Sequence, residues 1–173
     1  RSEIGVIFQD FIRYQMQAVV NIAVGRISER DNKPRIDHAA AQSLADSVIK
    51  RLPEGYDQMV GRYFQKGVDL SGGEWQKLGL ARAYMRDAQV LILDEPTAAL
   101  DARAEHEVFE RFTELTAGKT AVLISHRFST VRMADRILVL EGGKPLEIGS
   151  HKELLAAEGR YAELFRLQQK GYM

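Results

Sequence analysis

Two adjacent carboxylates, Asp94 and Glu95, follow directly after the apolar run Val90 to Leu93. An unbroken apolar run of this length predicts a strand that is buried on both faces. The pair would then lie at the carboxyl end of a sheet, where open α/β folds bind ligands. There the first carboxylate could hold Mg²⁺ for nucleotide hydrolysis, and the second could polarise the attacking water. A solvated acidic loop after a buried strand is the alternative interpretation of the pair alone.

Ser71, Gly72 and Gly73 stand where a helix is predicted to begin. Apolar residues recur from there to about Arg86 at steps of three and four positions, which is the spacing of one helical face. A glycine-rich helix N-terminus is a ready anion site, because the backbone can approach closely and the helix dipole favours negative charge. The same triplet could equally be an ordinary N-cap.

Gln9 and His126 are further polar residues at predicted strand ends. Gln9 follows the apolar run Ile4 to Phe8, and His126 comes after Ser125 at the end of the run Ala121 to Ile124. His126 could contact a γ-phosphate, or it could satisfy a polar group in a turn. Gln9 has the same ambiguity, so neither residue by itself indicates one chemistry.

The glycine-rich phosphate loop of nucleotide hydrolases, G-x-x-x-x-G-K-[ST], does not precede these residues. Gly118-Lys119-Thr120 spells the end of such a loop, but the first glycine of the motif would fall at Thr113. A phosphate loop follows a strand and opens a helix, whereas here a predicted helix precedes the triplet and a strand follows it. We therefore interpret Gly118 as a helix C-cap.

Composition narrows the class of protein. The chain has 173 residues, of which 45% are hydrophobic, enough for one sizeable core or a core with a small subdomain. Its 24 basic and 24 acidic residues balance, so the net charge predicts neither a nucleic-acid partner nor an anionic membrane surface. The absence of cysteine excludes disulfides and thiolate metal sites. No apolar run approaches the roughly 18 residues of a membrane span, and no signal peptide is recognisable at the start.

Strands that alternate with helices predict an α/β fold with a parallel sheet. Asp37 is expected to cap a helix that runs to Lys50. The other expected elements are a helix over 102–116, a strand over 121–124, a hairpin of Arg136 to Leu140 and Leu146 to Ile148 around Gly142-Gly143, a capping box at Ser150-His-Lys-Glu153, and a last helix with Tyr161, Leu164 and Leu167.

In their joint order and spacing these residues resemble the nucleotide-binding domain of ATP-binding cassette (ABC) transporters, nearly end to end. The matching motifs are Gln9, Leu70-Ser-Gly-Gly-Glu74, Val90-Leu-Ile-Leu-Asp-Glu-Pro96, Ala99-Leu-Asp101 and Ser125-His126. The resemblance implies a P-loop NTPase core with a parallel sheet, incomplete at the N-terminus, plus a helical subdomain. Residues 1–173 would form one partial ATPase domain. About 12–86 would be the helical subdomain with the signature motif, and 1–11 with 87–173 the remaining α/β core and C-terminal helices.

The resemblance assigns a role to each polar residue near a strand end. It implies that Gln9 senses Mg²⁺ and couples to a membrane domain, that Asp94 holds Mg²⁺, and that Glu95 is the catalytic base. It further implies that His126 is the switch histidine and that Asp101 is the D-loop aspartate at a dimer seam. ATP and Mg²⁺ are therefore the expected ligands.

Leu70, Ser71, Gly72, Gly73 and Glu74 look like the signature motif of the family. In the family this motif binds the γ-phosphate of ATP that the opposite subunit holds. A second nucleotide-binding domain is therefore an expected partner, in an ATP-sandwich dimer. Glu74 replaces the glutamine that is usual at the last position.

Two runs look like exporter-type domains: Leu52-Pro-Glu-Gly-Tyr-Asp57, and Ser125-His-Arg-Phe-Ser-Thr-Val131 followed by Ala134-Asp135. The resemblance thus implies a domain that couples ATP hydrolysis to transport through transmembrane domains, at the cytoplasmic face of the inner membrane and without nucleic acid. The run Gly61-Arg-Tyr-Phe-Gln-Lys-Gly67 departs from the common exporter sequence. We expect the chain alone to be inactive, because loss of the phosphate loop and its helix removes the main ATP contacts and exposes part of the core.

Two other classes of function stay open. Leu-Ser-Gly-Gly-Glu is also common in soluble ABC-type ATPases of DNA maintenance and in translation-factor relatives. The neutral charge argues against that class because it lacks a basic footprint, and the run Gly149-Ser-His-Lys-Glu-Leu-Leu155 is similar to transporter domains. The third class is a non-catalytic interaction fragment.

Overall fold

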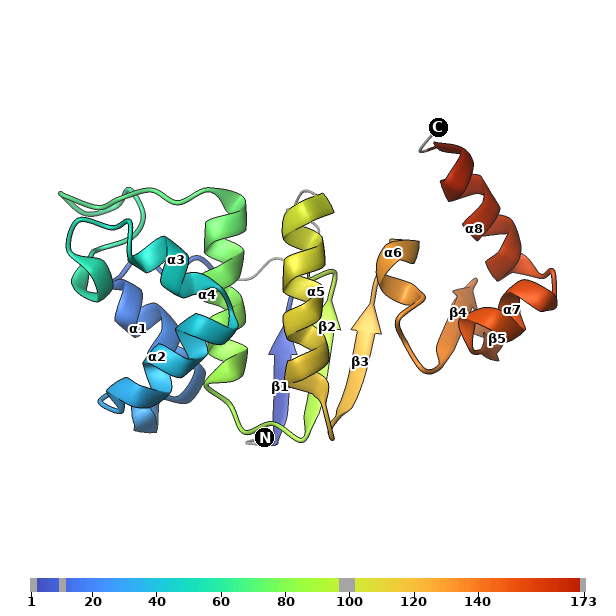
Figure 1. The fold of residues 1–173 in the computed structure, drawn as a ribbon, viewed down its shortest axis with the longest axis horizontal. Helices are drawn as coiled ribbons and strands as arrows, with labels where there is room; N and C mark the ends of the chain where they lie inside the picture. The colour runs from blue at the N-terminus through green and yellow to red at the C-terminus, as the bar shows by residue number, and fades with distance from the viewer. Residues whose placement is uncertain (1–2, 10–11, 97–101, 172–173) are drawn as a thin grey trace. The chain divides into compact units, whose positions relative to one another are not determined.

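The computed structural model describes residues 3–9, 12–96 and 102–171, in two compact units, Arg1–Ile124 and Ser125–Met173 (Figure 1). Each unit is considered by itself. The first contains β1 (Ile4–Ile7), α1 (Ala18–Ala23), the 3₁₀ helix η1 (Val24–Glu29), α2 (Lys33–Gln42), α3 (Ala45–Ile49), the 3₁₀ helix η2 (Gly55–Asp57), α4 (Gly72–Tyr84), β2 (Val90–Asp94), α5 (Ala102–Thr116) and β3 (Thr120–Ile124). The second contains α6 (Phe128–Val131), β4 (Ile137–Glu141), β5 (Lys144–Gly149), α7 (His151–Ala156) and α8 (Arg160–Gly171).

The first unit is built on a parallel sheet with the strand order β1-β2-β3 (Figure 1). Ile7 pairs with Leu93 and Asp94 pairs with Ile124, so the three strands end at the same edge. Helices connect the strands along the chain, as parallel pairing requires. The α/β fold with a parallel sheet is therefore confirmed.

Helices α4 and α5 cover one face of this sheet. One hydrophobic cluster joins them to the strands: Ile7, Leu80, Ala83, Ala88, Leu91, Leu93, Val108, Phe109, Phe112 and Leu115. The predicted apolar face of α5, with Val108, Phe112 and Leu115, is confirmed as buried. Each large side chain in the cluster contributes about 1.5–3 kcal/mol by leaving water, which fixes the helices on the sheet.

The opposite face of the sheet is partly exposed. Ile4, Val6, Val122 and Ile124 are between 39% and 49% exposed. The expectation that the strand over 90–93 is buried on both faces is wrong, since alternate residues of β2 are only half-buried. An unbroken apolar run shows that both faces are apolar, but it does not show which elements cover them.

Helices α1 to α3 pack with α4 around a second core. Trp75, Leu78 and Met85 are fully buried there, at the helical spacing that the sequence predicted for this stretch. The predicted helix over 71–86 is confirmed, with Ser71 as its N-cap and Met85 as its C-cap.

The predicted helix from Asp37 to Lys50 is wrong in two respects. Asn32, and not Asp37, caps α2, because its Oδ1 accepts a hydrogen bond from the Arg35 N–H at 3.2 Å. The stretch is also two helices, since Leu44 has a φ of 61° and ends the helical path between α2 and α3. Few non-glycine residues adopt this left-handed conformation, so the apolar spacing alone could not predict the break.

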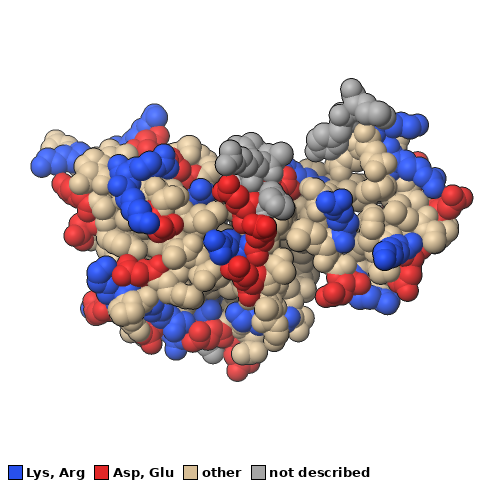
Figure 2. All heavy atoms as spheres, in the orientation of Figure 1, with Lys and Arg blue, Asp and Glu red and all other residues tan. Residues whose placement is uncertain are grey.

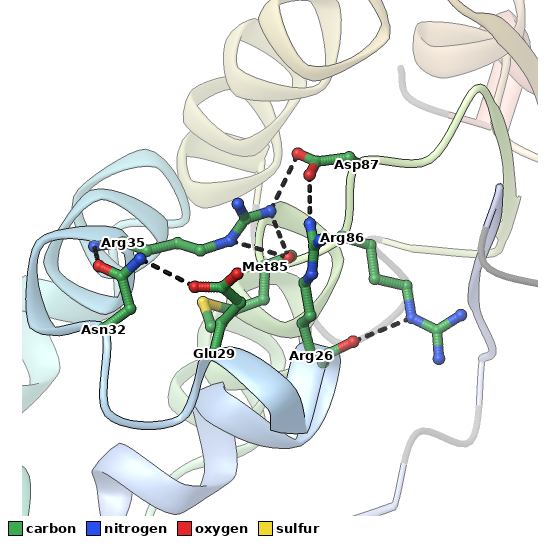
Figure 3. A network of polar contacts seen from close by, with 8 residues as sticks. Arg26, Glu29, Asn32, Arg35, Met85, Arg86 and Asp87 are labelled. Carbon is green, nitrogen blue, oxygen red and sulfur yellow. Dashed lines mark hydrogen bonds and ion pairs between the residues drawn. The ribbon is translucent and has the colours of Figure 1, made fainter.

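Arginine side chains hold the C-terminal end of α4 (Figure 3). Arg35 Nη2 donates to the Met85 carbonyl oxygen at 2.7 Å and to Asp87 Oδ1 at 2.9 Å, and Arg26 also pairs with Asp87. The last carbonyls of a helix lack intrahelical donors, so Arg35 satisfies one of them. Hydrogen bonds from Arg35 lower the pKa of Asp87 more than its slight burial raises it, and Arg26 lowers it further.

The second unit confirms its predicted local elements. β4 and β5 form an antiparallel hairpin whose turn uses Gly142 and Gly143 at φ values of 58° and 76°, where residues with a Cβ are strained. Ser150 and Glu153 form the predicted capping box at α7. Tyr161 of α8 is buried with Ile137 and Leu154.

Charged side chains are intermixed on the surface of the first unit. Figure 2 shows basic and acidic residues side by side over its helical part. None of the helices described, within 3–9, 12–96 and 102–171, combines the length and apolar character needed to cross a membrane.

Candidate functional site

The carboxyl edge of the sheet brings Gln9, Asp94 and Glu95 together. Because Ile7 pairs in parallel with Leu93, the residues after β1 and after β2 leave the sheet at the same edge. Gln9 is exposed there, whereas Asp94 and Glu95 are half-buried. The parallel pairing of β1 and β2 therefore carries two carboxylates and one amide to the same edge of the sheet.

Glu95 has an uncommon backbone conformation. Its φ is 45°, in the left-handed region that residues with a Cβ rarely occupy. Its N–H donates to the carbonyl oxygen of Ile124 at 2.9 Å, so the end of β3 holds the turn in place. Non-glycine residues in this region often mark functional sites. The sequence carried no signal for this conformation, because a glutamate before a proline does not favour it.

Ser71 caps α4 through a reciprocal capping box. The Glu74 N–H donates to Ser71 Oγ at 3.3 Å, and the Ser71 N–H donates to Glu74 Oε2 at 2.8 Å. The N–H groups of Gly72 and Gly73 belong to the first turn of the helix, where no intrahelical acceptor exists. The two interpretations of the triplet are thus compatible, because the cap leaves these two donors for an anion. Leu70, just before the cap, is buried.

The start of α4 lies near the edge that carries the carboxylates. Gly73 and Lys77 line a small cavity together with Ile7 and with Pro96, which directly follows Glu95. The start of α4 and the ends of β1 and β2 all belong to the first unit. The signature-like helix start and the ends of β1 and β2 are therefore neighbours.

Glu74 interacts with Arg51, a residue that the sequence analysis did not single out. Arg51 Nη2 donates to Glu74 Oε1 at 2.7 Å, from a position 23 residues away. Burial raises the pKa of Glu74, but the hydrogen bonds from Ser71 and the charge of Arg51 outweigh it, so the pKa lies below its ordinary value. No local pattern could have revealed this pair, because Arg51, just after α3, and Glu74 on α4 meet only in the folded chain.

Glu74→Gln is expected to destabilise the first unit at pH 7 by about 0.2–1 kcal/mol, the range of exposed ion pairs. Glutamine keeps the capping box but removes the ion pair with Arg51. A carboxyl group whose pKa is lower in the folded than in the unfolded chain stabilises the folded state at pH values above its unfolded pKa. That stabilisation is lost as the pH falls through the folded pKa. The difference in free energy of unfolding between wild type and Glu74→Gln should therefore shrink as the pH falls below 4.5, the ordinary pKa of glutamate.

Urea denaturation at pH 7 and at a pH well below that value measures this difference. Arg51→Gln is the matched control: it should cost the same at pH 7, and the double variant should cost no more than either single change. A difference that is equal at both pH values contradicts the assignment.

Asp101 and His126 are the two remaining residues that the sequence analysis assigned to the site. Asp101 lies outside the described residues. His126 belongs to the second unit, where its carbonyl accepts from Gln168 Nε2 at 3.4 Å and its side chain is exposed. Ser125 Oγ accepts from the Arg127 N–H at 3.1 Å. The roles of Asp101 and His126 stay predictions.

Gly118 is a helix C-cap, as predicted. Its φ is 72°, and the following Lys119 N–H donates to the carbonyl oxygen of Thr116 in the last turn of α5 at 2.9 Å. The triplet therefore ends a helix, whereas a phosphate loop opens one.

The donor set at the sheet edge fits Mg²⁺ that arrives with a nucleotide. Among the described residues, no three His, Cys, Asp or Glu side chains cluster closely enough to hold a metal ion by themselves. Mg²⁺ is usually held by one or two carboxylates together with phosphates and water. Asp94 and Gln9 would fit that requirement if the phosphates of a nucleotide supplied further ligands.

Comparisons with known proteins point to one family. The model of the ABC transporter family matches residues 1–98. ATP-dependent lipid A-core flippases are 42% identical over 171 residues in Legionella pneumophila strain Paris and 43% identical over 168 residues in Burkholderia pseudomallei strain 1710b. These matches cover 99% and 97% of this chain, but only 28% and 27% of the length of the relatives.

A solved structure, that of a bacterial Atm1-family ABC exporter with ATP bound, superposes with a TM-score of 0.86. Its sequence is 37% identical, and the match covers 97% of this chain and 28% of the exporter. The likeness therefore extends over almost all of this chain and over about a quarter of the exporter.

Proposed function

The chain belongs to the ABC transporter family, and we propose that it is part of the nucleotide-binding domain of a membrane exporter. In that role it couples ATP hydrolysis to transport. The observation that carries the proposal is the parallel pairing of β1 with β2, which carries Gln9, Asp94 and Glu95 to the same edge of the sheet. The names of the relatives, two flippases and an exporter, support it. Because the chain spans about 28% of their length, the transport belongs to a longer parent protein.

In this proposal each residue at the sheet edge has one task. Asp94 and Gln9 would hold Mg²⁺, and the ion would neutralise charge on the β- and γ-phosphates of ATP. Glu95 orients the attacking water and accepts its proton. The Glu95 N–H, bonded to the carbonyl oxygen of Ile124, anchors the backbone of this turn to β3. For His126, which belongs to the second unit, the proposed role is that of the switch histidine that senses the γ-phosphate.

The signature-like residues serve a second nucleotide-binding domain. Leu70 to Glu74 present the first turn of α4 to the γ-phosphate of ATP held by the partner, with Asp101 at the seam. Transmembrane domains complete the assembly, at the cytoplasmic face of the inner membrane. Residues 12–86 act as the helical subdomain, and 1–11 with 87–173 as the α/β core with its C-terminal helices.

Glu74 does not favour the alternative of a soluble ATPase in DNA maintenance or translation. Its side chain is engaged by Ser71 and Arg51 within the chain. Glutamine forms the same capping box, so either residue serves the helix start equally well. Glu74 is therefore a local choice of capping residue, and it carries no information about the partner.

The 173 residues by themselves are expected to show no Mg²⁺-dependent ATP turnover above background, because they contain no phosphate loop. A purified parent protein in lipid should hydrolyse ATP under the same conditions. Phosphate release, with the Glu95→Gln chain as background control, measures both. Turnover by the 173 residues that Glu95→Gln abolishes would contradict this expectation, and an inactive parent would contradict the proposed function.

A further inference from the structure

Gln168 of α8 bridges two backbone groups on either side of Arg127. Its Oε1 accepts a hydrogen bond from the Phe128 N–H at 3.0 Å, and its Nε2 donates to the carbonyl oxygen of His126 at 3.4 Å. Only one orientation of the amide makes both bonds, because the flipped amide would place a donor against a donor and an acceptor against an acceptor. One side chain therefore holds the backbone that carries His126, from a position 42 residues further along the chain.

The segment that Gln168 holds lies outside any helix or strand. His126 and Arg127 stand between the end of β3 and the four-residue helix α6. Arg127 is the N-cap of α6, but its side chain makes no capping bond. The first N–H groups of a helix lack intrahelical acceptors, so the Phe128 N–H needs a partner from elsewhere. Gln168 supplies that partner, 40 positions away in the sequence.

Aromatic rings hold α8 against the same segment. The Phe128 ring contacts the rings of Tyr161 and Phe165 edge to face, with ring centres 5.2 Å apart in the first pair and 5.3 Å apart in the second. Tyr161 is buried, and its hydroxyl lies 2.7 Å from His151 Nδ1. Tyr161, Phe165 and Gln168 are four and three positions apart, which places them on one face of α8. The rings and the amide thus approach the start of α6 together.

The N-terminus of α8 is fixed from β5. Glu147 Oε1 accepts from the Arg160 N–H at 2.7 Å, and its Oε2 accepts from the Tyr161 N–H at 3.0 Å. A carboxylate at this position satisfies N–H groups of the first turn and is favoured by the helix dipole. Further along α8, Leu167 is 57% exposed, whereas Gln168 is half-buried. The anchored helix therefore turns the amide, and not the leucine, toward residues 126–128.

We propose that Gln168 is a positioning residue for His126, so that α8 sets the place of the histidine that senses the γ-phosphate. The side chain of His126 is exposed, so its position depends in part on the backbone that carries it. Gln168 does not touch the nucleotide in this proposal and acts only through His126. Its effect on turnover rests on the proposed function, whereas the hydrogen bonds exist independently of it.

Gln169 provides the matched control. It has the same side chain, follows directly on α8 and is exposed. Successive residues of a helix point about 100° apart, so Gln169 does not share the face of Gln168. Methionine has nearly the shape of glutamine and a similar helix propensity, but it cannot make both hydrogen bonds. Gln168→Met and Gln169→Met therefore differ in whether the two bonds to residues 126–128 are lost.

The first measurement is amide hydrogen exchange in the purified parent protein without nucleotide. Gln168→Met should lower the protection of residues 126–131 by about two- to tenfold, the factor that corresponds to one net hydrogen bond. The protection of the hairpin, residues 137–149, should stay unchanged, and Gln169→Met should leave both segments unchanged. Protection of residues 126–131 that persists in Gln168→Met overturns the inference, whether or not the protein hydrolyses ATP. An equal loss over the hairpin also overturns it, because the role would then be a general structural one.

The second measurement is the steady-state kinetics of ATP turnover by the parent protein. Gln168→Met is expected to lower kcat by about tenfold or more, because a small misplacement of a group in the site is costly. The KM for ATP should change by less than about twofold, and Gln169→Met should keep the wild-type kcat. An unchanged kcat in a Gln168→Met protein whose residues 126–131 have loosened overturns the positioning role.

A double variant separates positioning from an independent contribution of Gln168. His126→Ala removes the side chain that Gln168 is proposed to position, so adding Gln168→Met should lower kcat no further. Losses of kcat that multiply in the double variant overturn the inference. A wild-type kcat in His126→Ala contradicts the role of His126, and with it the role of Gln168.

Gln168→Asn is a milder variant that guards against misfolding. It keeps the amide but is shorter by one methylene group, so it cannot reach both backbone groups. We expect a kcat as low as that of Gln168→Met, and a wild-type kcat in Gln168→Asn counts against the inference. If the wild-type parent itself lacks ATP turnover, the proposed function fails, and exchange at residues 126–131 alone decides whether the positioning exists.

Discussion

Glu95→Gln in the parent protein is expected to slow ATP turnover by about 100-fold or more while ATP binding is retained. Glutamine has nearly the same shape but cannot accept the proton of the attacking water. The backbone turn at Glu95 is held by Ile124, so the variant keeps the geometry of the sheet edge and loses only the base. The ATP-bound dimer should therefore persist, with ATP trapped in it.

Phosphate release and retention of labelled ATP measure these two effects. Glu163→Gln is the control, because Glu163 is an exposed residue of α8 that pairs with Arg160 and should tolerate the change. A variant at Glu95 that hydrolyses ATP at the wild-type rate shows that Glu95 is not the base. A variant that no longer binds ATP assigns Glu95 to binding instead.

Gly72→Asp in the parent protein is expected to lower ATP turnover by about 100-fold or more without destabilising the fold. A carboxylate in the first turn of a helix is favourable for the helix itself. The same charge would repel a phosphate that approaches the N–H groups of Gly72 and Gly73. The variant should therefore lose ATP turnover while its thermal stability stays the same or rises.

This contrast separates the two interpretations of the helix start. If Ser71 to Gly73 were only an N-cap, Gly72→Asp would be neutral or stabilising, and turnover would be unchanged. Thermal denaturation and ATP turnover of the same preparation distinguish the cases. Gly72→Asn, which adds bulk without charge, is the control, and we expect it to retain more activity than Gly72→Asp.

Short-range patterns in the sequence predicted local structure well. The capping box at Ser150, the hairpin at Gly142-Gly143 and the C-cap at Gly118 all formed as expected. Each depends on residues within about four positions of one another, where the backbone itself brings the partners together. The apolar spacing of α4 and α5 succeeded for the same reason.

Predictions from the sequence were wrong where the outcome depended on elements outside the stretch considered. The run over 90–93 is apolar on both faces, but α4 and α5 cover only one. The spacing over 37–50 suits one helix, yet Leu44 takes a left-handed conformation and Asn32 is the better cap. Competing local choices of similar energy are settled by packing, which a single stretch of sequence does not contain.

The sequence by itself showed which polar residues follow the apolar runs, and it identified the family to which the motifs belong. Gln9, Asp94 and Glu95 each follow an apolar run, and parallel pairing is enough to bring them to one edge. Only the tertiary structure revealed the strained turn at Glu95 and the contacts of Gln168, because Gln168 and Phe128 are 40 positions apart. Contacts at that separation form only when the whole core packs, so no local pattern encodes them.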